Sequence, residues 1–250
     1  MDSSGVTVTS DGKKANILNE YFASVGTIDN GSIPGNTESQ PKMVLDTVVF
    51  DARNIIAAVR KLKANLSAGP DGLPPLLYKR LQSSIAKPLA LLLTQLFSTG
   101  VVPEAWKTAI IVPVFKKGTA SNVANYRPNS LTCVASKIME RVIAKCIYDH
   151  LASNNLLSST QHVFIKGRST CTNLLESMND WTLSVQNKKG VSIAYIDFTR
   201  AFDSVTHIKL FNRLYSYGIQ GDLLHWLTQF FFLVAHTKLM LVCVYLMLLY

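Results

Sequence analysis

The sequence predicts an α+β fold, because helical and strand-like patterns both occur along its 250 residues. Residues 136–151 repeat apolar side chains at the spacing of one helix face. Residues 108–115 and 191–196 are instead short runs rich in β-branched side chains, which is typical of buried strands. Hydrophobic residues make up 48% of the chain, which is enough for a sizeable core in one domain or two small ones.

Residues 1–45 predict a linker-like segment ahead of the folded domain. Ser, Gly, Asn, Thr and Asp are frequent in it, as in other connecting segments. Residues 15–25 are the exception, since their apolar side chains share one face of a short helix. The first ten residues are polar, so we expect no signal peptide and an intracellular location, nuclear or cytoplasmic.

The next part of the chain predicts helices on either side of a tight loop. Asp51 is a candidate N-cap for a helix that runs to Lys63. Residues 67–75 (SAGPDGLPP) carry enough Gly and Pro to force a turn. Residues 76–97 are again helical, and Pro88 predicts either a kink or a division into two helices.

Gly100 predicts the end of that helical segment, and the strand over residues 108–115 follows. Lys116 and Lys117 then lie in a turn.

The helix predicted over residues 136–151 carries Lys137, Arg141 and Lys145 on a second face, at i, i+4 and i+8. Such a row either follows a nucleic-acid backbone or is a solvated basic face, and the pattern alone leaves both readings open.

The strand predicted over residues 191–196 ends on Asp197, six residues before Asp203. A carboxylate at the end of a core strand lies on a rigid element and is well placed to hold Mg²⁺. An Asp in this position also commonly caps the next helical turn, so residue chemistry alone leaves both roles open. Further helices are predicted over residues 174–183 and 207–217, and from residue 221 onward.

The charge is strongly basic and unevenly distributed. The formal net charge is +9, and residues 60–145 hold thirteen Lys or Arg against three acidic residues, a net of +10. This concentration favours a nucleic-acid partner over an ordinary basic surface. The four cysteines show no metal-binding spacing, so they indicate buried or free thiols in a reducing compartment, and the five histidines give no zinc signature.

Four motifs occur in an order that resembles one known family. They are SAGPDGLPP (67–75), NYRPNSLT (125–132), QHVFIKGRST (161–170) and IDFTRAFDSV (196–205). This set resembles the reverse transcriptase domain of non-LTR (LINE-type, jockey/CR1-like) retrotransposons. The resemblance implies the fingers (46–185) and a partial palm (186–228) of a right-hand polymerase. It also implies an RNA-directed DNA polymerase that uses an RNA template, a DNA primer, dNTPs and Mg²⁺, with no obligate protein partner evident.

The resemblance also implies roles for individual residues. Asp197 would be the catalytic residue that ligates both Mg²⁺ ions. Lys117 and Arg127 would grip the nucleotide triphosphate, and Phe202 would pack under its sugar. The residues that would contact template or primer are Lys116, Gln161, Lys166 and Arg168.

Several positions depart from the family pattern. Asn129 stands where an apolar residue is usual, which would place an amide in a strand expected to be buried. Val163 replaces a glycine and would be strained if a positive φ were needed there. Ile165 replaces an arginine, and Asn65 and Leu66 stand where Lys-Ser is common.

The resemblance is expected to end near Leu227. The family would continue with strands that carry a Tyr/Phe-x-Asp-Asp turn, whereas residues 229–250 form an apolar tail and no Asp or Glu follows Asp222. We therefore expect a domain truncated before the second catalytic motif and inactive in polymerisation. The alternatives are a non-catalytic nucleic-acid-binding remnant and a membrane-tethered fragment. The uninterrupted apolar run, residues 239–250, is shorter than the ~20 residues of a spanning helix, so we do not expect a membrane partner.

Overall fold

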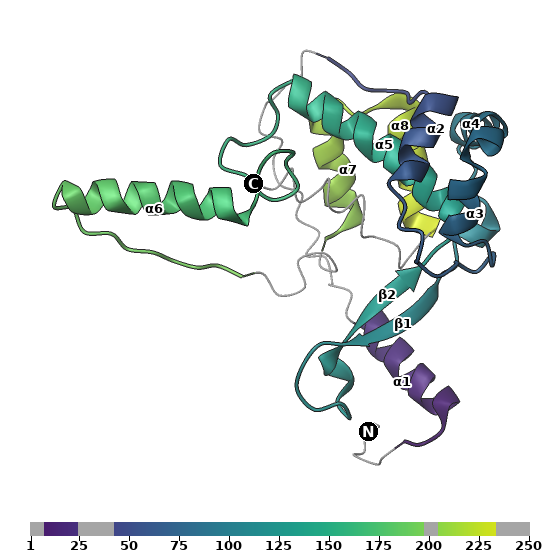
Figure 1. The fold of residues 1–250 in the computed structure, drawn as a ribbon, viewed down its shortest axis with the longest axis horizontal. Helices are drawn as coiled ribbons and strands as arrows, with labels where there is room; N and C mark the ends of the chain where they lie inside the picture. The colour runs from purple at the N-terminus through teal and green to yellow at the C-terminus, as the bar shows by residue number, and fades with distance from the viewer. Residues whose placement is uncertain (1–7, 25–42, 198–204, 234–250) are drawn as a thin grey trace.

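The computed structural model describes residues 8–24, 43–197 and 205–233, and the fold given below refers to these ranges. Helices dominate it, together with one two-stranded sheet. Figure 1 shows three parts: a group of packed helices, a β-hairpin with α1 beside it, and α6, which projects away from both. The α+β class is therefore observed, with a small β component.

The helical group holds the hydrophobic core. Its members are α2 (Ala52–Arg60), α3 (Pro75–Arg80), α4 (Gln82–Thr99), α5 (Val134–Ser153), α7 (His207–Ser216) and α8 (Gly221–Leu233). Ile55, Leu93, Ile143 and Trp226 come from four of these helices and are all fully buried in one cluster. Each buried side chain of this kind contributes roughly 1.5–3 kcal/mol. Helices predicted to belong to the fingers and helices predicted to belong to the palm thus share one core.

Helix α2 begins where the sequence predicts but ends three residues early. The Asp51 carboxylate accepts a hydrogen bond of 2.7 Å from the Asn54 amide, which confirms the N-cap. At the other end, Lys79 Nζ donates to the carbonyl oxygens of Arg60 and Leu62, at 3.2 and 2.8 Å. These contacts satisfy carbonyls that otherwise lack partners at a helix C-terminus.

The second helical segment divides into α3 and α4, although the division is not at Pro88. The chain leaves helical geometry at Leu81 (φ −98°, ψ 11°), whereas Pro88 lies inside α4. Gly100 ends α4 with φ of 67°, as predicted. A Cβ at Gly100 would also lie 2.8 Å from the His225 ring, so both backbone conformation and close packing favour glycine.

The β-hairpin consists of β1 (Ile110–Phe115) and β2 (Tyr126–Leu131), paired antiparallel so that Val112 faces Asn129. Strand β1 confirms the strand predicted over residues 108–115. The expectation that Asn129 lies in a buried strand is wrong, because its side chain is exposed. A two-stranded ladder with an uncovered face leaves that amide in solvent.

Helix α1 (Asp11–Ser24) confirms the short helix predicted in the upstream segment, and it begins earlier than expected. It lies beside the hairpin (Figure 1), and a pocket of about 300 Å³ between them is lined by Leu18 and Phe22 of α1 and by Ile111 and Pro113 of β1.

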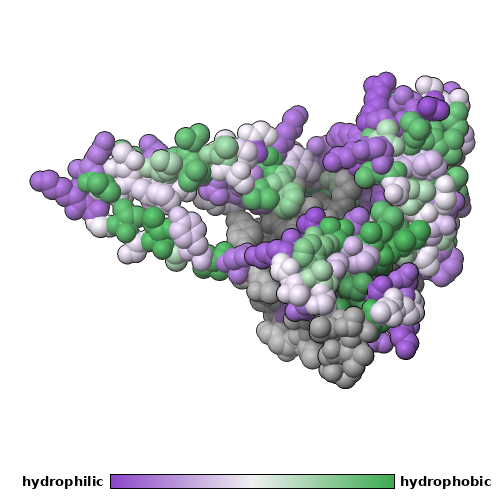
Figure 2. Space-filling model, turned by 60° about the horizontal axis from the view of Figure 1, so that its bottom comes forward, coloured by the Kyte–Doolittle hydropathy of each residue, from purple (hydrophilic) through white to green (hydrophobic). Residues whose placement is uncertain are grey.

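Helix α6 (Thr170–Gln186) and the segment after it form an arm with no hydrophobic core of its own. None of the residues of α6 is buried, and Figure 2 shows hydrophobic side chains on the surface of this arm. The buried strand predicted over residues 191–196 is wrong: the segment is not a strand, and Tyr195 and Ile196 are 86% and 79% exposed. Within the described residues no neighbouring strand pairs with it, and a strand without a partner leaves its backbone groups to water.

Among the described residues, no helix has the length and apolar character needed to cross a membrane. Residues 234–250, which include most of the predicted apolar tail, lie outside the described ranges. Helix α8 continues to Leu233, and Phe230 and Phe231 at the start of that tail are buried in the core.

Candidate nucleotide and nucleic-acid site

Three cations predicted to bind nucleotide or template lie on the β-hairpin. Lys116 and Lys117 follow β1 directly, and Arg127 lies on β2 opposite Val114. All three side chains are exposed, and among the described residues none of them forms an ion pair. The hairpin therefore presents three available positive charges close together in the chain.

The turn that carries these lysines is well braced. The Lys116 amide donates to the Asn125 carbonyl at 2.8 Å, and the Asn125 side chain donates to the Thr119 carbonyl at 2.9 Å. Gly118 has a φ of 90°, and a Cβ there would lie 2.7 Å from the Asn125 amide nitrogen. The ring of Phe115 packs on that of Tyr126 with centroids 5.5 Å apart. Such bracing holds charges in a fixed arrangement, which phosphate recognition requires.

The loop of the SAGPDGLPP motif packs against the end of β2. A Cβ at Gly69 would lie only 2.4 Å from the carbonyl carbon of Thr132 and 2.6 Å from the nitrogen of Cys133. Two of the four motifs are thus in direct backbone contact, and only glycine permits that approach.

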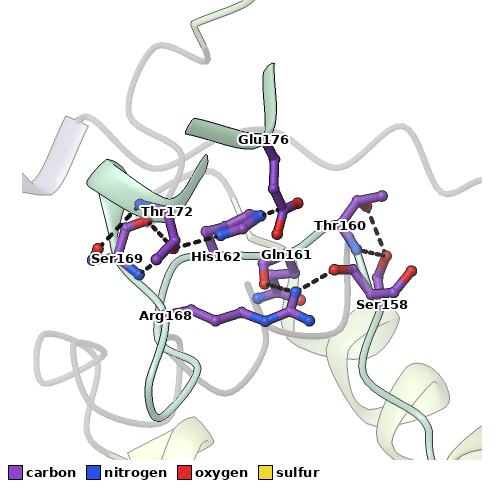
Figure 3. A network of polar contacts seen from close by, with 9 residues as sticks. Ser158, Thr160, Gln161, His162, Arg168, Ser169, Thr172 and Glu176 are labelled. Atoms are coloured by element: carbon purple, nitrogen blue, oxygen red, sulfur yellow. Dashed lines mark hydrogen bonds and ion pairs between the residues drawn. The ribbon is translucent and has the colours of Figure 1, made fainter. Parts of the chain in front are cut away.

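The QHVFIKGRST motif forms the loop between α5 and α6, and two of its predicted template-binding side chains are engaged within it (Figure 3). Arg168 Nη1 donates to the carbonyl oxygens of Ser159 and Gln161, the latter at 2.8 Å. Gln161 is buried, and its Nε2 donates to the Val163 carbonyl at 3.2 Å. Lys166, by contrast, is exposed. Template contact by Gln161 and Arg168 stays a prediction, and in this conformation it would compete with these bonds.

The strain expected at Val163 lies one residue further on. Phe164, not Val163, has a positive φ, of 63°. A bulky residue in the left-handed region is uncommon and marks a locally strained turn.

The basic row on α5 is largely engaged. Arg141 Nη1 lies 3.4 Å from the Ala58 carbonyl oxygen, and Lys145 pairs with Asp149 at 2.5 Å. Burial lowers the pKa of Lys137 and of Arg141, whereas the hydrogen bond to Asp149 raises the pKa of Lys145. A row of free cations tracking a nucleic-acid backbone is therefore less well supported than the hairpin.

Asp197 is the last described residue before the gap at 198–204, and its side chain is exposed. The predicted nucleotide contact Phe202 and the second carboxylate Asp203 both lie in that gap, outside the described residues. In the described ranges no three His, Cys, Asp or Glu side chains come together to hold a metal ion. One carboxylate does not form a site for two Mg²⁺ ions, so the described donor set alone does not fit them.

The sequence did not identify one further group of residues in this region. His162 lies between Thr172 and Glu176, both on α6, and bonds to each of them (Figure 3). The available sequence signal was weak: Ser169 is a favoured N-cap residue, but Thr172 stands where the capping-box sequence usually has Glu or Gln.

A reverse transcriptase family assignment follows from comparison with known proteins. The profile of the family described as reverse transcriptase (RNA-dependent DNA polymerase) matches residues 114–244, more than half of the chain. The chain therefore belongs to the reverse transcriptase family. The match begins in β1, includes all three hairpin cations, and continues beyond residue 228.

Individual relatives place the chain among the reverse transcriptases of non-LTR elements. It is 27% identical over 178 residues to the probable RNA-directed DNA polymerase from transposon BS of Drosophila melanogaster. It is 30% identical over 170 residues to the RNA-directed DNA polymerase from mobile element jockey of the same species. It is 29% identical over 151 residues to the Pol polyprotein from type-1 retrotransposable element R2 of Nasonia vitripennis. The LINE-type resemblance is thus confirmed.

These matches cover 71%, 67% and 59% of this chain, but only 20%, 18% and 14% of the respective relatives. The chain spans a fifth or less of their length.

Proposed function

We propose that this chain is part of an RNA-directed DNA polymerase of a non-LTR retrotransposon and that its hairpin binds nucleotide or nucleic-acid phosphate. It would supply the fingers (46–185) and part of the palm (186–228) of a right-hand polymerase. The observation that carries the proposal is the braced hairpin with Lys116, Lys117 and Arg127 exposed inside the family match.

The chemistry of these three residues suits phosphate. Arginine offers a planar fork of donors to phosphate oxygens, and lysine offers a compact point charge. In this proposal Lys117 and Arg127 hold the triphosphate of a dNTP. Lys116 and Lys166 contact the backbone of an RNA template or a DNA primer.

The second part of the proposal is that the 250-residue chain binds without extending a primer. Asp197 supplies one carboxylate, and no Asp or Glu follows Asp222 in the sequence. Two-metal phosphoryl transfer needs several fixed ligands around the ions. Catalysis with two divalent metal ions would need more carboxylate ligands than the described residues provide.

Binding of a labelled RNA–DNA hybrid at several salt concentrations tests the first part. We expect weak, sequence-independent binding that falls steeply with salt, because each neutralised phosphate releases counterions. Replacing Lys116, Lys117 and Arg127 together by Ala should reduce the slope of log affinity against log salt by about one, through the loss of Lys116, and should remove the weak binding of a labelled dNTP, through the loss of Lys117 and Arg127. Lys13→Ala, Lys188→Ala and Lys189→Ala together give a charge-matched control outside the hairpin. Binding that is insensitive to salt, or equally weakened by the control, would refute the hairpin site.

A further inference from the structure

His162 is a buried histidine with a partner at each ring nitrogen. Its side chain is 2% exposed, Nδ1 lies 2.8 Å from Thr172 Oγ1, and Nε2 lies 3.0 Å from Glu176 Oε2. Thr172 and Glu176 are four residues apart on α6, so they lie on the same face of that helix. The imidazole therefore joins the loop between α5 and α6 to the first two turns of α6 (Figure 3).

The start of α6 is fixed independently of His162. Ser169 is the N-cap, and its hydroxyl accepts from the Thr172 amide at 3.3 Å. The Thr172 hydroxyl in turn accepts from the Ser169 amide at 2.9 Å. A capping box of this kind satisfies two amides at the helix end. His162 is thus attached to a rigid point.

The hydroxyl–imidazole–carboxylate order of Thr172, His162 and Glu176 is also the order of a nucleophilic triad, but its setting excludes that role. The Thr172 hydroxyl is held by the Ser169 amide and lies 2.8 Å from the Ser169 carbonyl oxygen, so it is part of the cap. The Thr172 hydroxyl donates its one proton to the Ser169 carbonyl oxygen, so it accepts a hydrogen bond from the Nδ1–H of His162. A ring that also carries a proton on Nε2 donates there to the Glu176 carboxylate. The arrangement is suited to holding the loop between α5 and α6 in place against α6.

What His162 holds is the loop that presents Lys166. The Lys166 amide donates to the Tyr148 hydroxyl of α5 at 3.1 Å, so α5 supports the same loop. Arg168 is engaged with loop carbonyls. The Lys166 side chain is exposed, and among the described residues its ammonium group has no ion pair or hydrogen bond. Of the two cations in this motif, Lys166 is therefore the one available to a ligand.

We propose that His162 is a positioning residue for nucleic-acid binding: by tying the loop to α6 it fixes the place from which Lys166 contacts a phosphate of the template–primer backbone. This inference rests on the proposed function, since it assumes that the chain binds nucleic acid. It assigns to His162 no contact with the ligand itself.

A double-mutant cycle on the full chain, with a labelled RNA–DNA hybrid as the probe, tests the inference. Lys166→Ala should lower the salt slope of binding by about one. His162→Phe keeps the bulk of the ring but removes both hydrogen bonds, and it should lower the slope by about the same amount. The double variant should lose no more than either single variant, because both changes remove one and the same contact. His162→Gln, whose amide nitrogen carries two N–H donors for these acceptor oxygens, should restore most of the slope.

Folding and binding are separated by two further variants. Glu176→Ala removes one partner of His162 at an exposed position, so it should fold normally and still lower the slope. Lys189→Ala removes an exposed lysine that follows the far end of α6. It should leave unchanged the effects of Lys166→Ala and His162→Phe on the salt slope. Each variant is compared with the native chain in thermal melting.

The outcomes distinguish the two proposals. If the native chain does not bind the hybrid, the proposed function fails and the role of His162 fails with it. If the native chain binds and Lys166→Ala lowers the slope, but His162→Phe and Glu176→Ala do not, the role of His162 alone is wrong. Additive losses in the double variant would also overturn it, since they would mean that His162 supports the fold generally.

Discussion

Among the described residues, Glu140 is one whose ionisation the fold changes strongly. It lies on α5 with its carboxyl group buried and hydrogen-bonded to the Ser136 hydroxyl at 2.8 Å. Burial raises its pKa from 4.5 to about 7, even though Ser136, Lys137 and Arg141 each act in the opposite direction. Desolvation outweighs these three favourable neighbours because the charged form has lost its contact with water.

A pKa raised by folding makes stability depend on pH in a definite direction. The stabilising contribution of neutral Glu140 is complete below about pH 4.5 and is lost as the pH rises through about 7. The loss is on the order of 3 kcal/mol of unfolding free energy. Glu140→Gln keeps a neutral group of similar shape, so we expect it to be more stable than the native chain at pH 8, and by more than at pH 5. Denaturant unfolding at both values measures this difference.

Ser136→Ala is the control for that prediction, because it removes the hydrogen bond and keeps the titrating carboxyl. A stability difference between Glu140→Gln and the native chain that is the same at pH 5 and pH 8 would contradict the assignment.

At the scale of elements, the sequence predicted the helices well, but the strand that it predicted over residues 191–196 does not form. The helix expected over residues 174–183 is present in α6, although none of its residues is buried. A helix satisfies its backbone groups internally, whereas a strand depends on a neighbour that the local sequence does not specify. Strand β1 forms because β2 follows it closely, while residues 191–197 have no such neighbour among the described residues.

The same distinction applies to the candidate site. Lys116 and Lys117 could be located from sequence because a turn follows the predicted strand, whereas Arg127, which lies on β2, was singled out only by the family resemblance. The hydrogen bonds made by Arg168 and Gln161 could not be predicted, because their partners are backbone carbonyls whose directions depend on the loop conformation. His162 was missed for a related reason: its partners lie ten and fourteen residues away, and only the folded loop brings them together.

The boundary of α8 gives a prediction for two truncations. Phe230 and Phe231 are buried, and the Phe230 ring stacks on Trp226 with centroids 4.8 Å apart. Removing residues 230–250 should lower the melting temperature strongly, because loss of even one buried Phe side chain costs about 3–5 kcal/mol. Removing residues 234–250 should leave melting nearly unchanged and raise the soluble yield, because it deletes the apolar run. If the chain that lacks residues 234–250 melts at as low a temperature as the chain that lacks residues 230–250, then residues 234–250 contribute to the core.

At the scale of the whole molecule, early and late segments of the chain meet in the helical group, and the candidate binding elements lie outside that group. The Leu45 amide donates to the Gly218 carbonyl at 2.9 Å, and the Gln220 amide donates back to Leu45 at 3.0 Å, so early and late segments meet. In Figure 1 the hairpin extends from one side of this group, and α6 extends from another. The hairpin cations and the loop that carries Lys166 would therefore contact different parts of a bound nucleic acid.

This arrangement, with the count of carboxylates, predicts that the 250-residue chain does not extend a primer with Mg²⁺ or Mn²⁺. Positioning of metals and reactants is most of what a protein contributes to phosphoryl transfer, and one carboxylate on an exposed segment cannot fix two ions. The hairpin would still hold a dNTP weakly, because its contacts are to phosphate. Incorporation of labelled dNTP on a primed RNA template measures the activity, with Asp197→Ala as the control. Extension by the native chain that disappears in Asp197→Ala would overturn the prediction, because another carboxylate, Asp203 first among them, would then have to complete the site.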